Sequence, residues 1–450
     1  MYKRQLADKG VGYGILAERV NGFDVFAVYE ATRRAVERGA AGGGPSLIEA
    51  VCYRFGPHAT ADDPALYRTR SEEELWRPYD PIDRCRRFLE SRGWWGEPEE
   101  KALIEEATEE FDASLDRVSA KPLPPRSDIV SHVFERIPKV MVEELTRLEA
   151  DAGEVLTEFP AGDVWSVDEE PVPEGPKTDL SMAEAINAAL VGEMERDPSV
   201  ILLGEDVAVA GGVFRISEGL LERFGPERVI DTPINESGIV GSAIGMAMAG
   251  ARPVAEIQFE GFSYPAFDQI ASHLGRIRFR SRGNTSVPMV VRMPNGAGIG
   301  AHEHHCDSPE AYFAHVPGVV VVVPSTPQDA KGLLISAIRS PDPVVFLEPK
   351  VLYRAGRESV PDESYEIPFG RSRVARSGAD MTLVTYGGMV PVCLRAAEAA
   401  SAGGVSVEVI DLRTIYPWDI DTVSNSVRRT GRLLVVQEPQ RTGGIGAEIV

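Results

Sequence analysis

The feature that most constrains the fold is a series of short, continuously apolar segments between residues 177 and 360, separated by helical patterns. We expect helices from Met182 to Arg196, from Ala266 to Arg278 and from Pro327 to Arg339. The apolar segments read VILLG, PVAEIQF, MVVRM, VVVVVP and PVVFLEP. A strand without polar alternation is buried on both faces, as in a parallel sheet with helices on each side. The pattern therefore predicts an α/β fold with a doubly covered parallel sheet.

Further regions precede and follow this sheet in the sequence. Residues 366–450 contain MTLVTYG, VSVEVIDL and RLLVVQE with helical stretches between them, which predicts another α/β unit. Residues 6–150 begin with a strand, a helix and a strand and continue as charged helices, one of them from Glu97 to Val118. Residues 151–176 are acidic, rich in Pro and Gly and aperiodic, which is typical of a solvated linker. We place the main boundary in this linker.

The composition disfavours several classes of partner. The 47 Lys and Arg residues face 69 Asp and Glu, and the net charge of -22 repels nucleic-acid backbones and anionic lipid surfaces. The longest apolar run, residues 316–324, is far shorter than a membrane span of about 20 residues. The four cysteines lack C-x-x-C spacing and indicate reduced thiols. We therefore expect a soluble, cytoplasmic protein that binds neither nucleic acid nor membranes.

A first cluster of polar side chains follows the apolar strand that ends near Arg54. The loop after it contains His58, Asp62 and Asp63. Loops at strand ends often carry active-site groups, because the strand fixes the position and the loop leaves the side chain exposed. A solvent-facing histidine held by a neighbouring aspartate would give the same local sequence.

A second cluster, Asp231 to Gly238, precedes the small-residue sequence IVGSAIGMAMAGA. Glu236 stands at the mouth of this apolar helix, where partial desolvation would suit its carboxyl group to sharing a proton with a ligand. Helix capping explains the same residues, with Asn235 as N-cap and Glu236 in the first turn. Both interpretations stay open at this point.

A third cluster is the glycine-rich segment from Gly296 to Glu310, which contains His302, His304 and His305. A zinc site is disfavoured, because the H-E-x-x-H pattern would need histidine where Cys306 stands, and because the segment is a loop rather than a helix. We expect no metal site in this chain.

Together the clusters resemble the decarboxylating, thiamine-diphosphate-dependent component of 2-oxo acid dehydrogenase complexes. Residues 6–150 are similar to the C-terminal part of its alpha subunit, with RFGPHATADDPALYR and ELWRPYDPIDRCRRFLESRGWW as markers. Residues 177–450 resemble its beta subunit through LLGEDVAVAGGVFRISEGL, DTPINESGIVGSA, EIQFEGFSYPAFDQI, HHCDSPEAYFAHVPG and VIDLRTIYPWD. The resemblance implies transketolase-like parallel-sheet domains, pyrimidine-binding over 177–360 and C-terminal over 366–450, plus a helical alpha-subunit tail.

The resemblance also implies roles for individual residues. Glu236 aligns with the glutamate that hydrogen-bonds the cofactor's aminopyrimidine, Phe262 aligns with the residue that packs on this ring, and Ile234 is expected among the cofactor-binding residues. Thiamine diphosphate itself supplies the electron sink. His58 and His305 align with histidines at the substrate entrance that serve acyl transfer, for which a near-neutral pKa is suited. Residues expected to order the His58 loop are Arg54, Asp62, Tyr67 and Arg68.

One family motif is missing. The alpha subunit normally carries G-D-G, followed by an asparagine, to hold magnesium and the diphosphate, and no G-D-G occurs in this chain. We expect the magnesium site to lie upstream of residue 1 and the C-terminal domain to be truncated at Val450, so that the chain alone is inactive. The resemblance adds a monovalent cation to the expected cofactors.

The expected function is oxidative decarboxylation of a 2-oxo acid with transfer of the acyl group to the lipoyl group of a partner acyltransferase. SPEAYFAH and EPKVLYR favour a branched-chain 2-oxo acid, and thus branched-chain amino acid catabolism; pyruvate and acetoin enzymes are the alternative. A catalytically dead fragment or regulatory pseudoenzyme is a further alternative, against which the presence of Glu236, His58 and His305 argues. We expect a homo-oligomer equivalent to two alpha and two beta units within a multienzyme complex.

Overall fold

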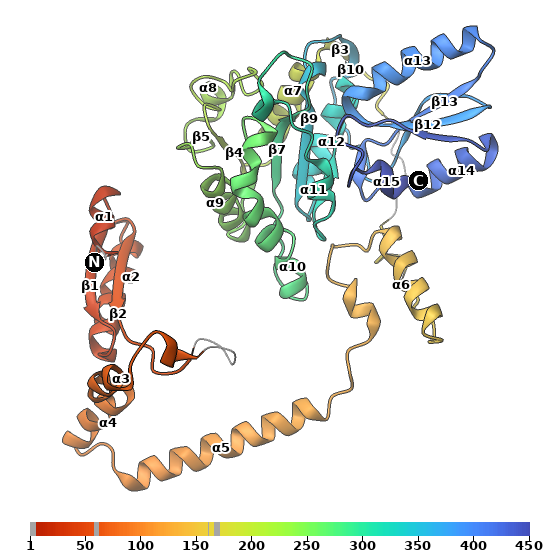
Figure 1. Ribbon diagram of the computed structural model, residues 1–450. Coiled ribbons are helices and arrows are strands. Elements are labelled where there is room, and N and C mark those ends of the chain that lie inside the picture. Colours follow the sequence, from red (N-terminus) through yellow and green to blue (C-terminus); the bar gives the residue numbers. More distant parts are fainter. Residues whose placement is uncertain (1–5, 58–62, 161, 166–171) are drawn as a thin grey trace. The chain divides into compact units, whose positions relative to one another are not determined.

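The computed structural model describes residues 6–57, 63–160, 162–165 and 172–450 (Figure 1). The chain divides into two compact units, Met1–Leu123 and Pro124–Val450. Each unit is described by itself below. Within the described ranges, no helix combines the length and the apolar content that crossing a membrane requires.

The first unit begins with a parallel strand pair joined by a helix. β1 (Leu16–Asn21) and β2 (Ser46–Val51) pair in register from Leu16 with Ser46 to Asn21 with Val51. The helix between them, α2 (Val25–Ala40), starts where the Asp24 carboxylate accepts the backbone N–H groups of Phe26 and Ala27. The expected strand, helix and strand are therefore confirmed.

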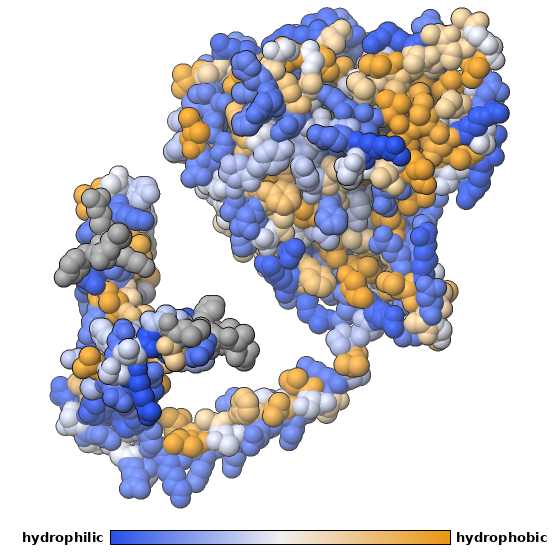
Figure 2. All heavy atoms as spheres, in the orientation of Figure 1, coloured by the Kyte–Doolittle hydropathy of each residue, from blue (hydrophilic) through white to orange (hydrophobic). Residues whose placement is uncertain are grey.

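Helices make up the rest of this unit. They are α1 (Asp8–Gly12), α3 (Arg70–Trp76), α4 (Pro81–Ser91) and α5 (Glu97–Ser119). α5 matches the helix expected over residues 97–118, but none of its residues is buried. Figure 2 shows apolar side chains exposed along it, and Phe111 is 66% exposed.

The second unit is built on a seven-stranded sheet with strand order β14-β8-β9-β7-β6-β4-β5. Its strands are β4 (Val200–Gly204), β5 (Val229–Asp231), β6 (Arg252–Glu256), β7 (Val290–Asn295), β8 (Val320–Val322), β9 (Val344–Pro349) and β14 (Thr414–Tyr416). All neighbours pair in parallel except β14 with β8. The sheet thus has the expected parallel core.

Helices cover both faces of this sheet. They are α7 (Met182–Arg196), α8 (Leu220–Phe224), α9 (Glu236–Met248), α10 (Ile277–Arg280), α11 (Glu310–Ala314) and α12 (Pro327–Arg339). Successive strand residues enter different cores: Leu202 packs with α7 and α12, whereas Leu203 packs with α9. The unbroken apolar strands are explained by this double coverage. The single helix expected over 266–278 is instead a 3-10 turn, a π-helix (Gln269–Leu274) and α10.

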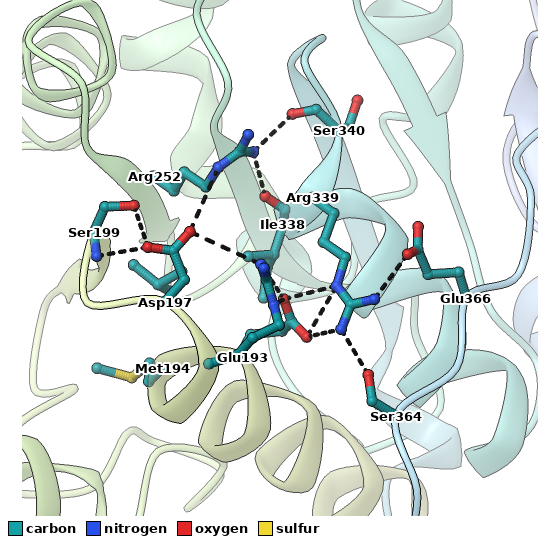
Figure 3. A network of polar contacts seen from close by, with 12 residues as sticks. Glu193, Met194, Asp197, Ser199, Arg252, Ile338, Arg339, Ser340, Ser364 and Glu366 are labelled. Atoms are coloured by element: carbon teal, nitrogen blue, oxygen red, sulfur yellow. Dashed lines mark hydrogen bonds and ion pairs between the residues drawn. The ribbon is translucent and has the colours of Figure 1, made fainter.

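An ion network joins α7 to α12 on one face (Figure 3). The Glu193 carboxylate, 1% exposed, receives Arg339 Nη2 at 2.6 Å and Arg339 Nε at 3.0 Å. Arg339 also binds Glu366 at 2.8 Å, and Arg252 donates to the carbonyl oxygens of Ile338 and Ser340. The network fixes the C-terminal end of α12 against α7 and against the strand edge.

A second sheet follows, with strand order β11-β13-β12-β15. Its strands are β11 (Arg373–Arg376), β12 (Met381–Thr385), β13 (Val407–Asp411) and β15 (Leu433–Val435), and its helices are α13 (Val390–Ala402), α14 (Ile420–Thr430) and α15 (Gly446–Ile449). Val384, Tyr386 and Ile410 share a core with α9. A separate two-stranded antiparallel sheet is formed by β3 (Lys177–Leu180) and β10 (Glu358–Pro361).

The unit boundary differs from the one expected at residues 151–176. Residues 124–151, which the hydropathy pattern assigned to the N-terminal part, belong to the second unit. Met141 and Leu145 of α6 (Lys139–Asp151) are buried in its core. Trp165 packs against the same core, and Ile137 pairs with Val164. Apolar side chains spaced through this acidic segment pack on the core of the second unit and anchor the segment there. The average composition of the segment did not predict this packing.

Candidate active site

Residues from every predicted cluster of the second unit meet at one edge of the seven-stranded sheet. Glu205 follows β4, Glu236 follows β5, Phe262 follows β6, and the loop carrying His305 follows β7. These strands are parallel neighbours, so their carboxyl ends lie side by side. Ligands of open α/β sheets bind at this edge.

Glu236 is the first residue of α9 and is half-buried. The Asn235 side chain accepts the backbone N–H of Gly238 at 2.9 Å, so the predicted N-cap exists. Ser237 Oγ donates to the carbonyl oxygen of Pro265 at 2.5 Å, which ties the helix start to the segment after Phe262. Ile234, two residues before Glu236, is 84% exposed. Asn235 thus caps the helix and Glu236 lies in its first turn, as the capping interpretation expects, and this arrangement is compatible with a ligand at the Glu236 carboxylate.

A second carboxylate, Glu205, lies beside Glu236. Glu205 is 7% exposed, and its Oε1 has no hydrogen-bond partner among the described residues. Burial raises the pKa of Glu205, and the negative charges of Glu236 and Asp206 raise it further. These surroundings thus favour the uncharged form of the Glu205 carboxyl group. The sequence reasoning missed Glu205, although its position directly after the apolar strand VILLG was a usable signal.

Phe262 and His305 come together with a third ring. The His305 ring lies edge-on to Phe262 with a centroid distance of 5.1 Å and to Phe259 with one of 4.5 Å. His305 Nδ1 is buried and has no hydrogen-bond partner within the described part of the chain. The imidazole is therefore held by aromatic packing on one side, with a nitrogen available to a bound molecule.

Glu260, which lies between Phe259 and Phe262 in the sequence, belongs to a buried ion pair. Glu260 Oε1 is 2.7 Å from Lys350 Nζ, and both side chains are fully buried. Burial raises the pKa of Glu260 to about 7 despite the lysine. The ammonium group also lies 5.8 Å from the centre of the Phe259 ring. This ion pair anchors the Phe259–Phe262 turn. The sequence did not predict the pair.

The histidine-bearing loop, residues 296–307, closes on itself. Gly296 N donates to the carbonyl oxygen of Asp307 at 2.9 Å. Tyr264 Oη donates to Asp307 Oδ2 at 2.9 Å. His302 and His304 are exposed. The partner of the His304 side chain among the interactions described is its neighbour Glu303. Of the three histidines, His305 alone reaches the aromatic cluster in the described residues.

In the first unit, Arg68 lies at the base of the predicted His58 loop. Its guanidinium donates to the carbonyl oxygens of Arg54 and, at 2.5 Å, Phe55. It also lies 5.5 Å from the centre of the Tyr53 ring. Tyr67 is 57% exposed. His58 and Asp62 themselves lie outside the described residues.

Comparison with known proteins assigns each part of the chain. Residues 2–127 match the dehydrogenase E1 component, residues 178–356 the pyrimidine-binding domain of transketolase, and residues 370–450 the transketolase C-terminal domain. The beta subunit of the pyruvate dehydrogenase E1 component from Acholeplasma laidlawii is 52% identical over 271 residues, which are 60% of this chain and 83% of that protein. The same subunit from Staphylococcus epidermidis is 53% identical over 270 residues, with the same coverage.

The chain belongs to the 2-oxo acid dehydrogenase E1 family. It is thus an oxidoreductase of a thiamine-diphosphate-dependent family with a transketolase-like fold. Among solved structures, a split gene transketolase, an inactive beta4 tetramer, is 23% identical with a TM-score of 0.48, covering 60% of this chain and 82% of that one.

The E1-family cofactor can be tested against the residues present. A half-buried carboxylate at Glu236, a buried carboxyl group at Glu205 with a partnerless oxygen, and the ring of Phe262 fit a flat, nitrogen-rich aminopyrimidine. The described residues around Glu236 fit the pyrimidine half of the cofactor. Within the described residues, no group of three or more His, Cys, Asp or Glu side chains could hold a metal ion.

Proposed function

We propose that this chain takes part in the oxidative decarboxylation of a 2-oxo acid and in transfer of the resulting acyl group to the lipoyl group of a partner acyltransferase. The observation that carries the proposal is the meeting of Glu205, Glu236, Phe262 and His305 at one edge of a parallel sheet. Bound thiamine diphosphate would supply the electron sink for the bond cleavage. The protein's part is to orient that group, exclude water and manage protons.

In this proposal Glu236 holds a proton at the ring nitrogen opposite the amino group of the aminopyrimidine. Its position at the start of α9 is compatible with this role, because Asn235 caps the helix. Glu205 lies nearby, where its burial and the charge of Glu236 raise the pKa of its carboxyl group. Phe262 would pack on the same ring, and Ile234 would be a further residue of the cofactor site.

His305 is proposed to act at the acyl-transfer step. Its buried Nδ1 lacks a partner among the described residues, so it can bind or release a proton at the mouth of the site. Edge-on packing against Phe259 and Phe262 keeps the ring from swinging away. His58 is proposed for the same step, with Arg54, Asp62, Tyr67 and Arg68 ordering its loop.

Pyruvate is the substrate that we propose first. The similar proteins are named as pyruvate dehydrogenase subunits, which supports pyruvate over the branched-chain substrate expected from EPKVLYR and SPEAYFAH. The packing of EPKVLYR weakens its value as a substrate marker. Glu348 pairs with Arg292 at 2.8 Å, Lys350 pairs with Glu260, and Tyr353 donates to Glu348, all of them buried. These residues are accounted for by internal contacts.

The proposal extends to the assembly. A lipoyl-bearing acyltransferase is the expected partner, and two alpha-type and two beta-type units the expected oligomer, because the relatives are named as E1 components. The grouping of an alpha-type part with beta-type domains over 177–360 and 366–450 is proposed on the same grounds. Magnesium, a monovalent cation, acetoin as an alternative substrate and a cytoplasmic location stay predictions.

Substrate-dependent reduction of an artificial electron acceptor tests the proposal. The full chain would be assayed alone and mixed with a separately supplied alpha subunit, in the presence of thiamine diphosphate and magnesium, against pyruvate, 2-oxoisovalerate and acetoin. We expect kcat/KM to be highest for pyruvate, by about tenfold or more, which is about 1.4 kcal/mol in transition-state binding. A preference for 2-oxoisovalerate would reverse the substrate assignment. Turnover by neither the chain nor its mixture with a separately supplied alpha subunit would contradict the proposed activity.

A further inference from the structure

The loop that carries His305 is fixed at its first residues by the C-terminal domain. Glu438 follows β15, and its Oε1 accepts the backbone N–H of Ala297 at 2.5 Å. A methyl group at Gly296 would lie 2.8 Å from Glu438 Oε2, and one at Gly388 would lie 3.4 Å from it. The carboxylate is thus wedged between two glycines, one from the histidine loop and one from its own domain.

The surroundings show that this contact joins two domains. Glu310, at the start of α11, accepts a hydrogen bond from Tyr386 of the C-terminal domain at 2.8 Å. Glu438 also lines a cavity of about 370 Å³ together with Tyr264, Cys306 and Asp307.

The remaining parts of the loop have their own supports. Tyr264 holds Asp307 at the end of the loop. In its middle, the backbone of His304 lies so close to Gly261 that an added methyl group would be 2.1 Å from the His304 carbonyl oxygen. Cys306 Sγ donates to the carbonyl oxygen of Ala301 at 3.2 Å, which is a further contact within the loop. The start of the loop is therefore held by the C-terminal domain, and its later residues are held by the segment Glu260–Ala266.

We propose that Glu438 is a positioning residue for His305: by binding Ala297 it holds the histidine loop against the Phe259–Phe262 turn and so couples the C-terminal domain to the active site. This inference rests on the proposed function only for the use of His305. The placement of the loop itself can be measured without any turnover.

The first test observes the His305 ring directly. In protein labelled at the histidine Cε1 carbon, the His305 resonance would be assigned with His305→Asn and compared between variants. The rings of Phe259 and Phe262 should shift this resonance away from that of an exposed histidine. Glu438→Ala should move it back toward the exposed value, whereas Glu438→Gln, which keeps a carbonyl acceptor for Ala297, should largely restore the wild-type position. Glu448→Ala, an exposed residue of the same domain, is the control.

A second pair of variants tests the same contact from the loop. Gly296 and Gly300 both have positive φ, +80° and +73°, so alanine meets a similar backbone penalty at either position. Only at Gly296 would the new methyl group meet Glu438; at Gly300 nothing lies within 4 Å. Gly296→Ala should therefore shift the His305 resonance more than Gly300→Ala does. In the Glu438→Ala background, Gly296→Ala should add little.

The outcomes separate the inference from the proposed function. An unchanged His305 resonance in Glu438→Ala, with equal effects of the two glycine variants, would overturn the positioning role even in an active enzyme. Conversely, a shifted resonance with no enzyme activity in the wild type, either alone or mixed with a separately supplied alpha subunit, would keep the positioning role and reject the function. If both hold, Glu438→Ala should slow transfer to the lipoyl carrier several-fold more than the artificial-acceptor reaction, and Glu438→Gln should recover most of that loss.

Discussion

The imidazole of His305 lies edge-on to the phenyl ring of Phe262, with ring centroids 5.1 Å apart and an interplanar angle of 75°. The two residues come from separate loops, one after β6 and one after β7, which are neighbouring parallel strands. Their contact places a titratable group next to the ring expected to pack on the cofactor. The geometry of the loop around His305 can therefore be tested by experiment.

His305→Ala should impair acyl transfer to a lipoyl carrier more than the artificial-acceptor reaction. The reason is its place at the edge of the aromatic cluster, with a buried nitrogen available for proton transfer. We expect a loss of about 100-fold in the first assay and a much smaller loss in the second. His273→Ala, an exposed histidine of the same unit, serves as control. Equal losses in both assays would place His305 in the decarboxylation step instead.

Glu236→Gln should reduce decarboxylation of every 2-oxo acid by at least about 100-fold, because the amide cannot hold a proton for the cofactor ring. The amide keeps the size of the side chain, and Asn235 still caps α9, so folding should be unaffected. Glu222→Gln on the exposed side of α8 is the matched substitution. Single-turnover decarboxylation measures the effect, and a wild-type rate would reduce Glu236 to a helix-terminal residue.

Gly261→Ala should displace the histidine loop. The added methyl group would lie 2.1 Å from a backbone oxygen, which cannot rotate away as a flexible side chain can. We expect a destabilisation of about 1–3 kcal/mol, together with a loss of acyl transfer. Gly245→Ala on α9 is the control, since nothing lies within 4 Å of its added methyl group. Urea unfolding of both variants gives the comparison; a Gly261 variant as stable and active as the control would disprove the close approach.

Glu310→Gln should remove a pH dependence of stability. Burial raises the pKa of Glu310 from 4.5 to about 7. Because the pKa is raised in the folded state, the neutral Glu310 carboxyl group stabilises the fold fully below the unfolded pKa. This stabilisation is lost as the pH rises to about 7. The cost of ionising the carboxyl group above that range is about 3 kcal/mol. Glutamine can still accept the Tyr386 hydrogen bond, so the variant should gain stability relative to wild type between pH 5 and pH 8.

Urea unfolding at the two pH values checks this expectation. Glu398→Gln on the exposed side of α13 controls for the loss of a surface charge. A constant difference between wild type and Glu310→Gln at both pH values would mean that Glu310 stays ionised, or stays neutral, over the whole range.

Glu193→Ala should destabilise the second unit by about 3 kcal/mol, because it leaves the largely buried Arg339 guanidinium without its main partner. In Figure 3 this carboxylate receives the arginine from α12, whose side chain is 25% exposed. Glu195→Ala, on the same helix, breaks a pair with Arg223 whose side chains are 49% and 51% exposed. That change should cost less than about 1 kcal/mol. Thermal unfolding of the two variants is the measurement, and equal effects would contradict the argument.

The sequence alone determined the layered core of the second unit. Segments such as VVVVVP and PVVFLEP left only one arrangement that buries both faces, and the structure places Val344 and Val345 in opposite cores. Asn235 was recognisable as an N-cap for a similar reason, since a short polar side chain before an apolar helix has few other uses. Local physics was sufficient in these cases.

The linker was the reverse case. Residues 151–176 have the composition of a solvated segment, yet Trp165 packs on the core of the second unit, and α6 before it contributes Met141 and Leu145 to that core. A few apolar side chains in an acidic stretch decide where it docks, and average composition does not register them.

The site was decided partly by motif and partly by tertiary structure. Phe262 and His305 could be named in advance, but only the folded chain brings them into contact and adds the Glu205 carboxyl group beside Glu236. The hold of Glu438 on Ala297 spans 141 residues. Such pairings depend on the order of strands in a sheet and on domain packing, which are long-range properties. A sequence pattern determines which faces must be buried, whereas the packed structure determines which side chains then meet.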